Sequence, residues 1–135
     1  MATYNKFLPA TEAMNEGMNA GTDTWKIVLA TALANTDTTI TAEVPNGNGY
    51  TTGGNTVSVT SSATTAGVYK LVLASPAVWT ATGAGFTFRY AILYDSTTAT
   101  PVGYWDYGSS VVMNGTNADT FTFTPDGTNG VIQVA

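Results

Sequence analysis

The chain has 135 residues, of which 9 are acidic and 4 basic, and it contains no Cys and no His, so its formal net charge is −5. These counts exclude a disulfide, thiolate and imidazole metal sites and a Ser-His-Asp triad, and they argue against a phosphate-rich partner such as nucleic acid. With 44% hydrophobic residues and 26 Thr, which favours strands, the composition predicts one folded, Thr-rich domain.

The first 21 residues differ in pattern from the rest and predict an N-terminal arm or short helix over 1–21, ahead of a single β domain over 22–135. Pro9 suits the first turn of a helix over 9–19, and Gly17 or Gly21 suits its end. The segment has no apolar run of signal-peptide or membrane-spanning length, so we expect no export signal and no membrane association. An apolar stripe along it consists of Phe7, Leu8, Met14 and Met18.

From Asp23 onward apolar and polar residues alternate with a period of two, the pattern of half-buried strands. Turn sequences such as Asn114-Gly115 separate the alternating segments. Strands are expected at 23–31, 38–44, 55–61, 67–74, 77–81, 86–95, 102–107, 111–113, 120–124 and 131–134. Since little chain remains for crossover helices, we predict an all-β fold, an antiparallel β-sandwich or small barrel of about eight to ten short strands with a short N-terminal helix or arm.

Asp95 and Asp106 approach each other if the strands 86–95 and 102–107 pair as a hairpin. Two carboxylates roughly 5–10 Å apart are the device of glycosidases, whereas Asp residues at strand ends are ordinary polar or turn residues. The second interpretation is favoured, because a carbohydrate hydrolase also needs a larger scaffold for its cleft. We therefore expect no catalytic residue and no enzymatic activity.

Oxygen ligands for a hard cation occur in the C-terminal turns, but their spacing matches no EF-hand. They are Asn117, Asp119, Asp126 and Asn129. These are also standard turn residues, so no metal site is expected. The Gly-rich segment 46–54 lies in a stretch without charge from Val44 to Tyr69, which favours a surface loop over a phosphate cradle, and no cofactor is expected.

Aromatic residues concentrate at Tyr104, Trp105 and Tyr107, with Trp25 and Trp79 elsewhere in the chain. In a strand, Tyr104 points to one face and the other two point to the opposite face. One set is expected in the core, and the other at a subunit interface or, less favoured, on a platform for a sugar ring.

The four cations are scattered, so no basic face for nucleic acid is expected. A surface with few charges and many hydroxyls suits packing against other protein, which favours an interaction role. The expected interface residues are Tyr4, Phe7, Leu8, Met14, Met18, Trp105 and Tyr107.

Segments along nearly the whole chain resemble a group of small structural proteins encoded by tailed bacteriophages, although none of them is a catalytic signature. They are the opening MATYNKF, GTDTWKIVL at 21–29, GYTTGG at 49–54, YKLVL at 69–73, FRYAILY at 88–94 and GYWDYGS at 103–109.

The resemblance implies a virion component assembled in the host cytoplasm. For a small β-rich chain it implies a capsid decoration or cement protein on the outside of the shell, with the major capsid protein as partner and a homo-oligomer, often a trimer. Residues 1–20 are then expected to be an arm that folds onto a neighbour. The alternatives are a tail, connector or fibre-associated structural protein, or a small carbohydrate-binding β-sandwich.

Overall fold

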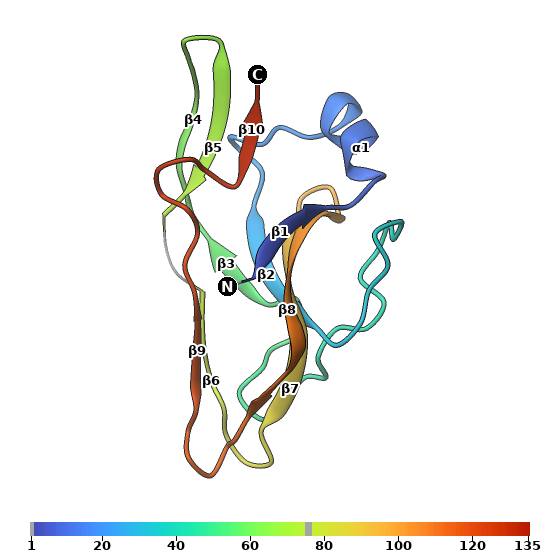
Figure 1. The fold of residues 1–135 in the computed structure, drawn as a ribbon, viewed down its shortest axis with the longest axis vertical. Helices are drawn as coiled ribbons and strands as arrows, with labels where there is room; N and C mark the ends of the chain where they lie inside the picture. Colours follow the sequence, from blue (N-terminus) through green and yellow to red (C-terminus); the bar gives the residue numbers. More distant parts are fainter. Residues whose placement is uncertain (1, 75–76) are drawn as a thin grey trace.

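The computed structural model describes residues 2–74 and 77–135, so Met1 of the predicted arm and residues 75–76 lie outside the described residues (Figure 1). The elements are, in chain order, β1 (Thr3–Lys6), α1 (Ala10–Glu16), β2 (Trp25–Ala30), β3 (Asn55–Val57), β4 (Val59–Thr65), β5 (Val68–Leu73), β6 (Ala77–Thr80), β7 (Phe86–Asp95), β8 (Thr100–Met113), β9 (Thr120–Phe123) and β10 (Ile132–Val134). Strands hold 48% of the residues and helix 5%, so the protein has the predicted all-β, sandwich-like fold.

A five-stranded antiparallel sheet with the order β1-β8-β7-β2-β3 forms the middle of the molecule. Its central strands are buried on both faces, as the run from Ile27 to Ala30 shows. One face packs against two smaller sheets, β10-β5-β4 and β6-β9, which lie end to end along the long axis (Figure 1). The long segment 31–54 covers the other face in the same view.

The segment 38–44 forms no strand, contrary to the prediction. It contributes one isolated bridge, between Ala30 and Glu43, and its backbone reaches β2 through a hydrogen bond from the Val44 N–H to the Leu29 carbonyl. The Leu29 N–H, which a continuing ladder needs, instead donates to the Tyr50 hydroxyl at 3.2 Å. A side chain therefore replaces the backbone partner and ends the pairing.

The predicted strands at 102–107 and 111–113 are one continuous strand, β8, with a bulge between them. Phe88 pairs with Val111, but Tyr90 pairs with Asp106, so residues 107–110 oppose Arg89 alone. Gly108 has a φ of 83°, which permits the local reversal that a bulge requires.

The predicted arm is hydrogen-bonded to the sheet of its own chain. Residues Thr3–Lys6 form the edge strand β1, paired with β8, and Phe7 is buried at 1% exposure. The helix spans Ala10–Glu16, shorter than the predicted 9–19, and Pro9 occupies its N-cap position. The Gly17 N–H donates to the Ala13 carbonyl at the C-terminal end of the helix.

Candidate functional site

The edge strands β1 and β10 belong to different sheets and lie on the same open side of the sandwich. Two surface hollows meet along this side, which we call the β1–β10 seam. Lys6 of β1 and residues 132–134 line the first hollow, whereas Tyr4 of β1 and residues 130–131 line the second. Since Tyr4 and Lys6 are two residues apart on one strand, they share a face, and the two hollows are neighbours.

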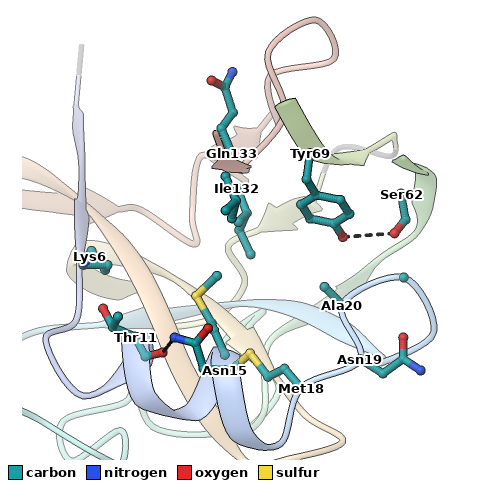
Figure 2. Close-up of a pocket in the computed structure, with 13 residues that line it drawn as sticks. Lys6, Thr11, Asn15, Met18, Asn19, Ala20, Ser62, Tyr69, Ile132 and Gln133 are labelled. Carbon is teal, nitrogen blue, oxygen red and sulfur yellow. Dashed lines mark hydrogen bonds between the residues drawn. The ribbon is translucent and has the colours of Figure 1, made fainter. Parts of the chain in front are cut away.

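The first hollow, the helix-end hollow, lies between α1, β10 and the β4–β5 hairpin and has a volume of about 520 Å³. Figure 2 shows Ile132 and Met18 approaching it from opposite sides. The Ser62 and Tyr69 hydroxyls are 2.9 Å apart at its border, and Asn15 Nδ2 donates to the Thr11 carbonyl at 2.8 Å. The hollow is thus lined by the apolar side chains of Met14, Met18 and Ile132, by neutral polar groups of which several are hydrogen-bonded, and by Lys6.

The second hollow, the aromatic hollow, has a volume of about 540 Å³. The centroids of the Tyr4 and Trp105 rings lie 4.9 Å apart, and those of the Trp105 and Phe123 rings 4.6 Å apart. Three rings from β1, β8 and β9 therefore form a row of neighbouring aromatic contacts. Tyr107 also lines this hollow, and burial raises the pKa of its hydroxyl. Such a cluster of half-buried rings is typical of interaction surfaces.

Gly103 permits the Tyr4 ring to lie directly against β8. A Cβ at Gly103 would overlap the ring and hydroxyl of Tyr4. Tyr4 stays 37% exposed, yet burial raises the pKa of its hydroxyl to about 12 because this end of the side chain lies against the sheet. Tyr4 therefore covers the β8 backbone with one face and leaves part of its ring accessible.

Five of the seven predicted interface residues line the seam. They are Met14 and Met18 in the helix-end hollow, and Tyr4, Trp105 and Tyr107 in the aromatic hollow. Phe7 does not join them, because it is a core residue whose ring lies 5.0 Å from that of Tyr104. Leu8 is 56% exposed but lines neither hollow.

Trp25 and Trp79 belong to the core, with 1% and 2% exposure, and are unavailable for a sugar platform. Trp25 Nε1 donates to the Ala20 carbonyl at 2.8 Å, which ties the segment before β2 to the sheet. Trp79 stacks on Phe121 at 5.8 Å, and its Nε1 is buried without a hydrogen-bond partner among the described residues.

The register of β7 and β8 separates Asp95 from Asp106. Asp95 pairs with Thr100 at the end of the hairpin, whereas Asp106 pairs with Tyr90, which lies five residues before Asp95 on β7. At 3.4 Å per residue this offset is roughly 17 Å, beyond the spacing of a glycosidase pair. The two strands do form the predicted hairpin, but they do not bring the two carboxylates together.

Each of these two Asp side chains has a local structural role. Asp95 is fully buried, and its Oδ1 accepts the N–H groups of Thr97 and Thr98 at 2.9 and 3.2 Å, which closes the turn after β7. Its Oδ2 is buried and accepts no hydrogen bond from the described residues. Burial raises the pKa of Asp95, and the neighbouring Asp23 carboxyl raises it further.

Asp106 forms a two-point ion pair with Arg89 across the bulge of β8. Arg89 Nε donates to Oδ1 at 2.8 Å and a terminal guanidinium nitrogen donates to Oδ2 at 3.0 Å. The Gly108 N–H also donates to Oδ1, at 2.8 Å. The Arg89 guanidinium, followed by this backbone N–H, lowers the pKa of Asp106, and the pair holds the bulged segment in place.

The four candidate cation ligands lie in two turns and the acidic ones serve as acceptors there. Asp126 accepts the N–H groups of Thr128 and Asn129 at 2.8 Å each, and Asp119 accepts the Asn114 N–H at 2.9 Å. Within residues 2–74 and 77–135, no group of three or more acidic side chains that could hold a metal ion is found.

Several residues of the seam that the prediction missed lie on β5, β9 and β10 and in the turn after β9. Tyr69, Ile132 and Gln133 line the helix-end hollow, and Phe123 and Asp126 line the aromatic hollow. The sequence placed Tyr69, Phe123, Ile132 and Gln133 on strands and Asp126 in a turn, but nothing local showed that β5 and β10 pair and face α1. That contact depends on sheet order, which a period of two does not encode.

A scan against models of protein families and searches of curated proteins and of solved structures find no match for this chain. In the part of the chain that the structure describes, no helix has the length and apolar character to cross a membrane.

Proposed function

We propose that the protein is a non-enzymatic structural component of a tailed-bacteriophage virion. It acts as a capsid decoration or cement protein that binds the outside of the shell through the β1–β10 seam. Its partners are the major capsid protein and further copies of itself. The observation that carries this proposal is the convergence of five sequence-selected interface residues on one open side of a rigid β-sandwich.

The chemistry of the seam supports contact with protein. Met, Tyr and Trp side chains are enriched at the centres of protein interfaces, and charged side chains are depleted there. Lys6 and Asp126 are the charged residues among those that line the two hollows. The chain contains no His and no Cys, and segments along nearly the whole of it resemble small structural proteins of tailed bacteriophages.

Charge substitutions in the seam test this role. Met18→Glu and Tyr4→Glu place a carboxylate in each hollow, where a docked shell would desolvate it, so we expect binding to shells to weaken at least tenfold. Thr87→Glu, at an exposed position of β7 outside both hollows, adds the same charge and should bind as the wild type does. Co-sedimentation with purified shells measures binding, and thermal unfolding checks that each variant is folded.

Electron microscopy of the virion gives the decisive localisation. The cement role requires repeated density for this chain on the outer surface of the shell. Density confined to the tail or connector would replace it with the alternative of a tail, connector or fibre-associated protein.

The aromatic hollow favours one second candidate, a carbohydrate-binding module. A partly accessible Tyr4 ring beside Trp105 offers an aromatic surface of the kind that stacks on sugar rings. Glycan-array binding that Tyr4→Ala removes, without loss of the folded state, would favour this candidate. Equal shell binding by Tyr4→Ala and the wild type would be consistent with it, because shell contact would then not use this ring.

A further inference from the structure

Among the described residues, β4 is the longest of the strands that stand at the end of a sheet. It has 7 residues and ends the sheet order β10-β5-β4. The other strands at a sheet end have three or four residues: β1, β3, β6, β9 and β10. A long free edge presents a row of backbone N–H and C=O groups to any strand that approaches.

The usual protections of an edge are largely missing from β4. It contains no charged residue and no Pro, and six of its seven residues are exposed. Its one irregularity is a bulge at its beginning, between Val59 and Ser61. By contrast β1 ends in Lys6, and the edge of β3 is bridged to β6 by Asn55 Nδ2, which donates to the Val78 carbonyl at 2.7 Å.

The tip of the β4–β5 hairpin lies free at one end of the molecule, whereas Ser62, in the middle of β4, packs against Gly21 and its hydroxyl lies 2.9 Å from that of Tyr69. Figure 1 shows its tip extending beyond α1 along the long axis. The two-residue turn Ala66-Gly67 closes it, so Thr65 and Val68 face each other directly. In such a hairpin hydrogen-bonded pairs alternate, and the backbone groups of Ser62 and Thr64 therefore point away from β5.

We propose that β4 is a self-association edge, which pairs antiparallel with β4 of a second copy about a two-fold axis near Ser62 and Ala63. The two hairpins then form one continuous sheet across the dimer. This inference rests on the part of the proposed function in which the protein binds further copies of itself. Its test, however, needs only the purified protein. Failure of shell binding and failure of β4 pairing are thus observed separately.

The absence of charged residues on β4 favours a second copy of the chain as the partner that pairs with this edge. A two-fold contact brings the residues next to the axis close to their own equivalents, so a charged residue there repels its copy. The chain carries a net charge of −5, yet it has no charge between Val44 and Tyr69, the stretch that contains β4. The β4 side chains are Ser, Thr, Ala and one Val, small enough for close approach and for Thr–Ser pairs between strands.

The variant Ala63→Glu is designed to weaken β4–β4 pairing between copies without destabilising the fold of each copy. Ala63 lies opposite Lys70 of β5, so the new carboxylate gains a cation within its own chain and the fold should be at least as stable. In the dimer the two Glu side chains approach each other, so we expect the dissociation constant to rise at least about tenfold. Thr87→Glu on β7 is the control of equal charge and should leave dimerisation unchanged.

Light scattering after size exclusion, over a concentration series, measures the result. The expected species is a dimer of twice 14.0 kDa for the wild type and Thr87→Glu, and a monomer for Ala63→Glu at the same concentration. A wild type that stays monomeric at every concentration, a trimer, or a dimer that Ala63→Glu does not weaken would overturn the proposal.

Single cysteines then locate the axis. The chain has no Cys, so one introduced Cys can form a disulfide only with a second copy. Paired antiparallel strands place Cα atoms about 4.5–5.5 Å apart, within disulfide range. Among Ser61→Cys, Ser62→Cys, Ala63→Cys and Thr64→Cys, we expect rapid cross-linking at one or two positions, and none for Thr87→Cys. Cross-linking no faster than that of Thr87→Cys at all four positions would contradict β4 pairing.

Discussion

The Asp95 carboxyl is buried at the end of the β7–β8 hairpin, and its raised pKa predicts a pH dependence of stability. Because burial and Asp23 raise the folded-state pKa above the unfolded one, the stability contribution is complete below the unfolded pKa and is lost as pH rises through the folded pKa. Asp95→Asn keeps an oxygen for the Thr97 and Thr98 N–H groups and removes the charge. We expect it to raise the free energy of unfolding at pH 7 but not at pH 3, in urea titrations.

Asp126 provides a control of opposite sign. Hydrogen bonds from the Asn129 and Thr128 N–H groups lower its pKa, so its contribution is present above the unfolded pKa and is lost as pH falls through the folded one. Asp126→Asn should therefore reduce stability at pH 7 and have little effect at pH 3. If both variants shift stability in the same direction at pH 7, the environment assigned to Asp95 is wrong.

Gly103 and Tyr4 should behave as one energetic unit. A Cβ at position 103 displaces the Tyr4 ring from Trp105, so Gly103→Ala should cost about 1 kcal/mol and alter the Trp fluorescence. In a Tyr4→Ala background the ring is already absent, and Gly103→Ala should then cost little. Equal costs in both backgrounds, in a double-mutant cycle, would mean that the ring does not occupy this space.

Among the elements, the β4–β5 hairpin holds local backbone strain at its tip. Ala66 has a φ of 50° and Gly67 a φ of 81°, the two positive values of a type I′ turn. Asn tolerates this conformation better than Ala, so Ala66→Asn should stabilise the protein by about 0.5–1 kcal/mol in thermal or urea unfolding. Gly67→Ala should destabilise it although a Cβ there meets no atom within 4 Å, because the cost lies in the backbone alone.

The strands that the sequence predicts well are those in which large apolar residues recur at every second position. The expected strand 86–95 has the observed bounds of β7, and 67–74 exceeds β5 by one residue at each end. The strand β1 escaped prediction because all four of its residues are exposed, so no alternation marks it. The middle of β8 escaped because Gly108, Ser109 and Ser110 carry little periodicity, and the Arg89–Asp106 pair supplies the order there.

At the scale of the whole molecule, the seam was predictable in its residue types and not in its geometry. Met14 and Met18 stand out in the sequence as part of an apolar stripe, and Trp105 and Tyr107 as part of an aromatic cluster. Their division into two hollows depends on the pairing of β1 with β8 and of β10 with β5, which joins segments far apart in the chain. No local pattern contains that information.

Removal of the first strand tests whether the N-terminal segment belongs to the domain. Deletion of residues 2–6 removes the β1–β8 ladder and the Tyr4–Trp105 contact, so we expect the free energy of unfolding to fall by about 3 kcal/mol in urea titrations. An arm that serves only a neighbouring molecule would give the shortened, isolated chain the same stability as the full one.

The pairing of Tyr4 with Trp105 also has a consequence for synthesis, because it joins two points about a hundred residues apart. On the ribosome β1 emerges long before β8 exists, so the five-stranded sheet can close only after β8 has been made. The β4–β5 hairpin, whose strands adjoin in the chain, needs no such delay. The order of folding is therefore expected to differ from the order of synthesis. β1 is made before the other strands of its sheet, but it pairs only once β8 is present.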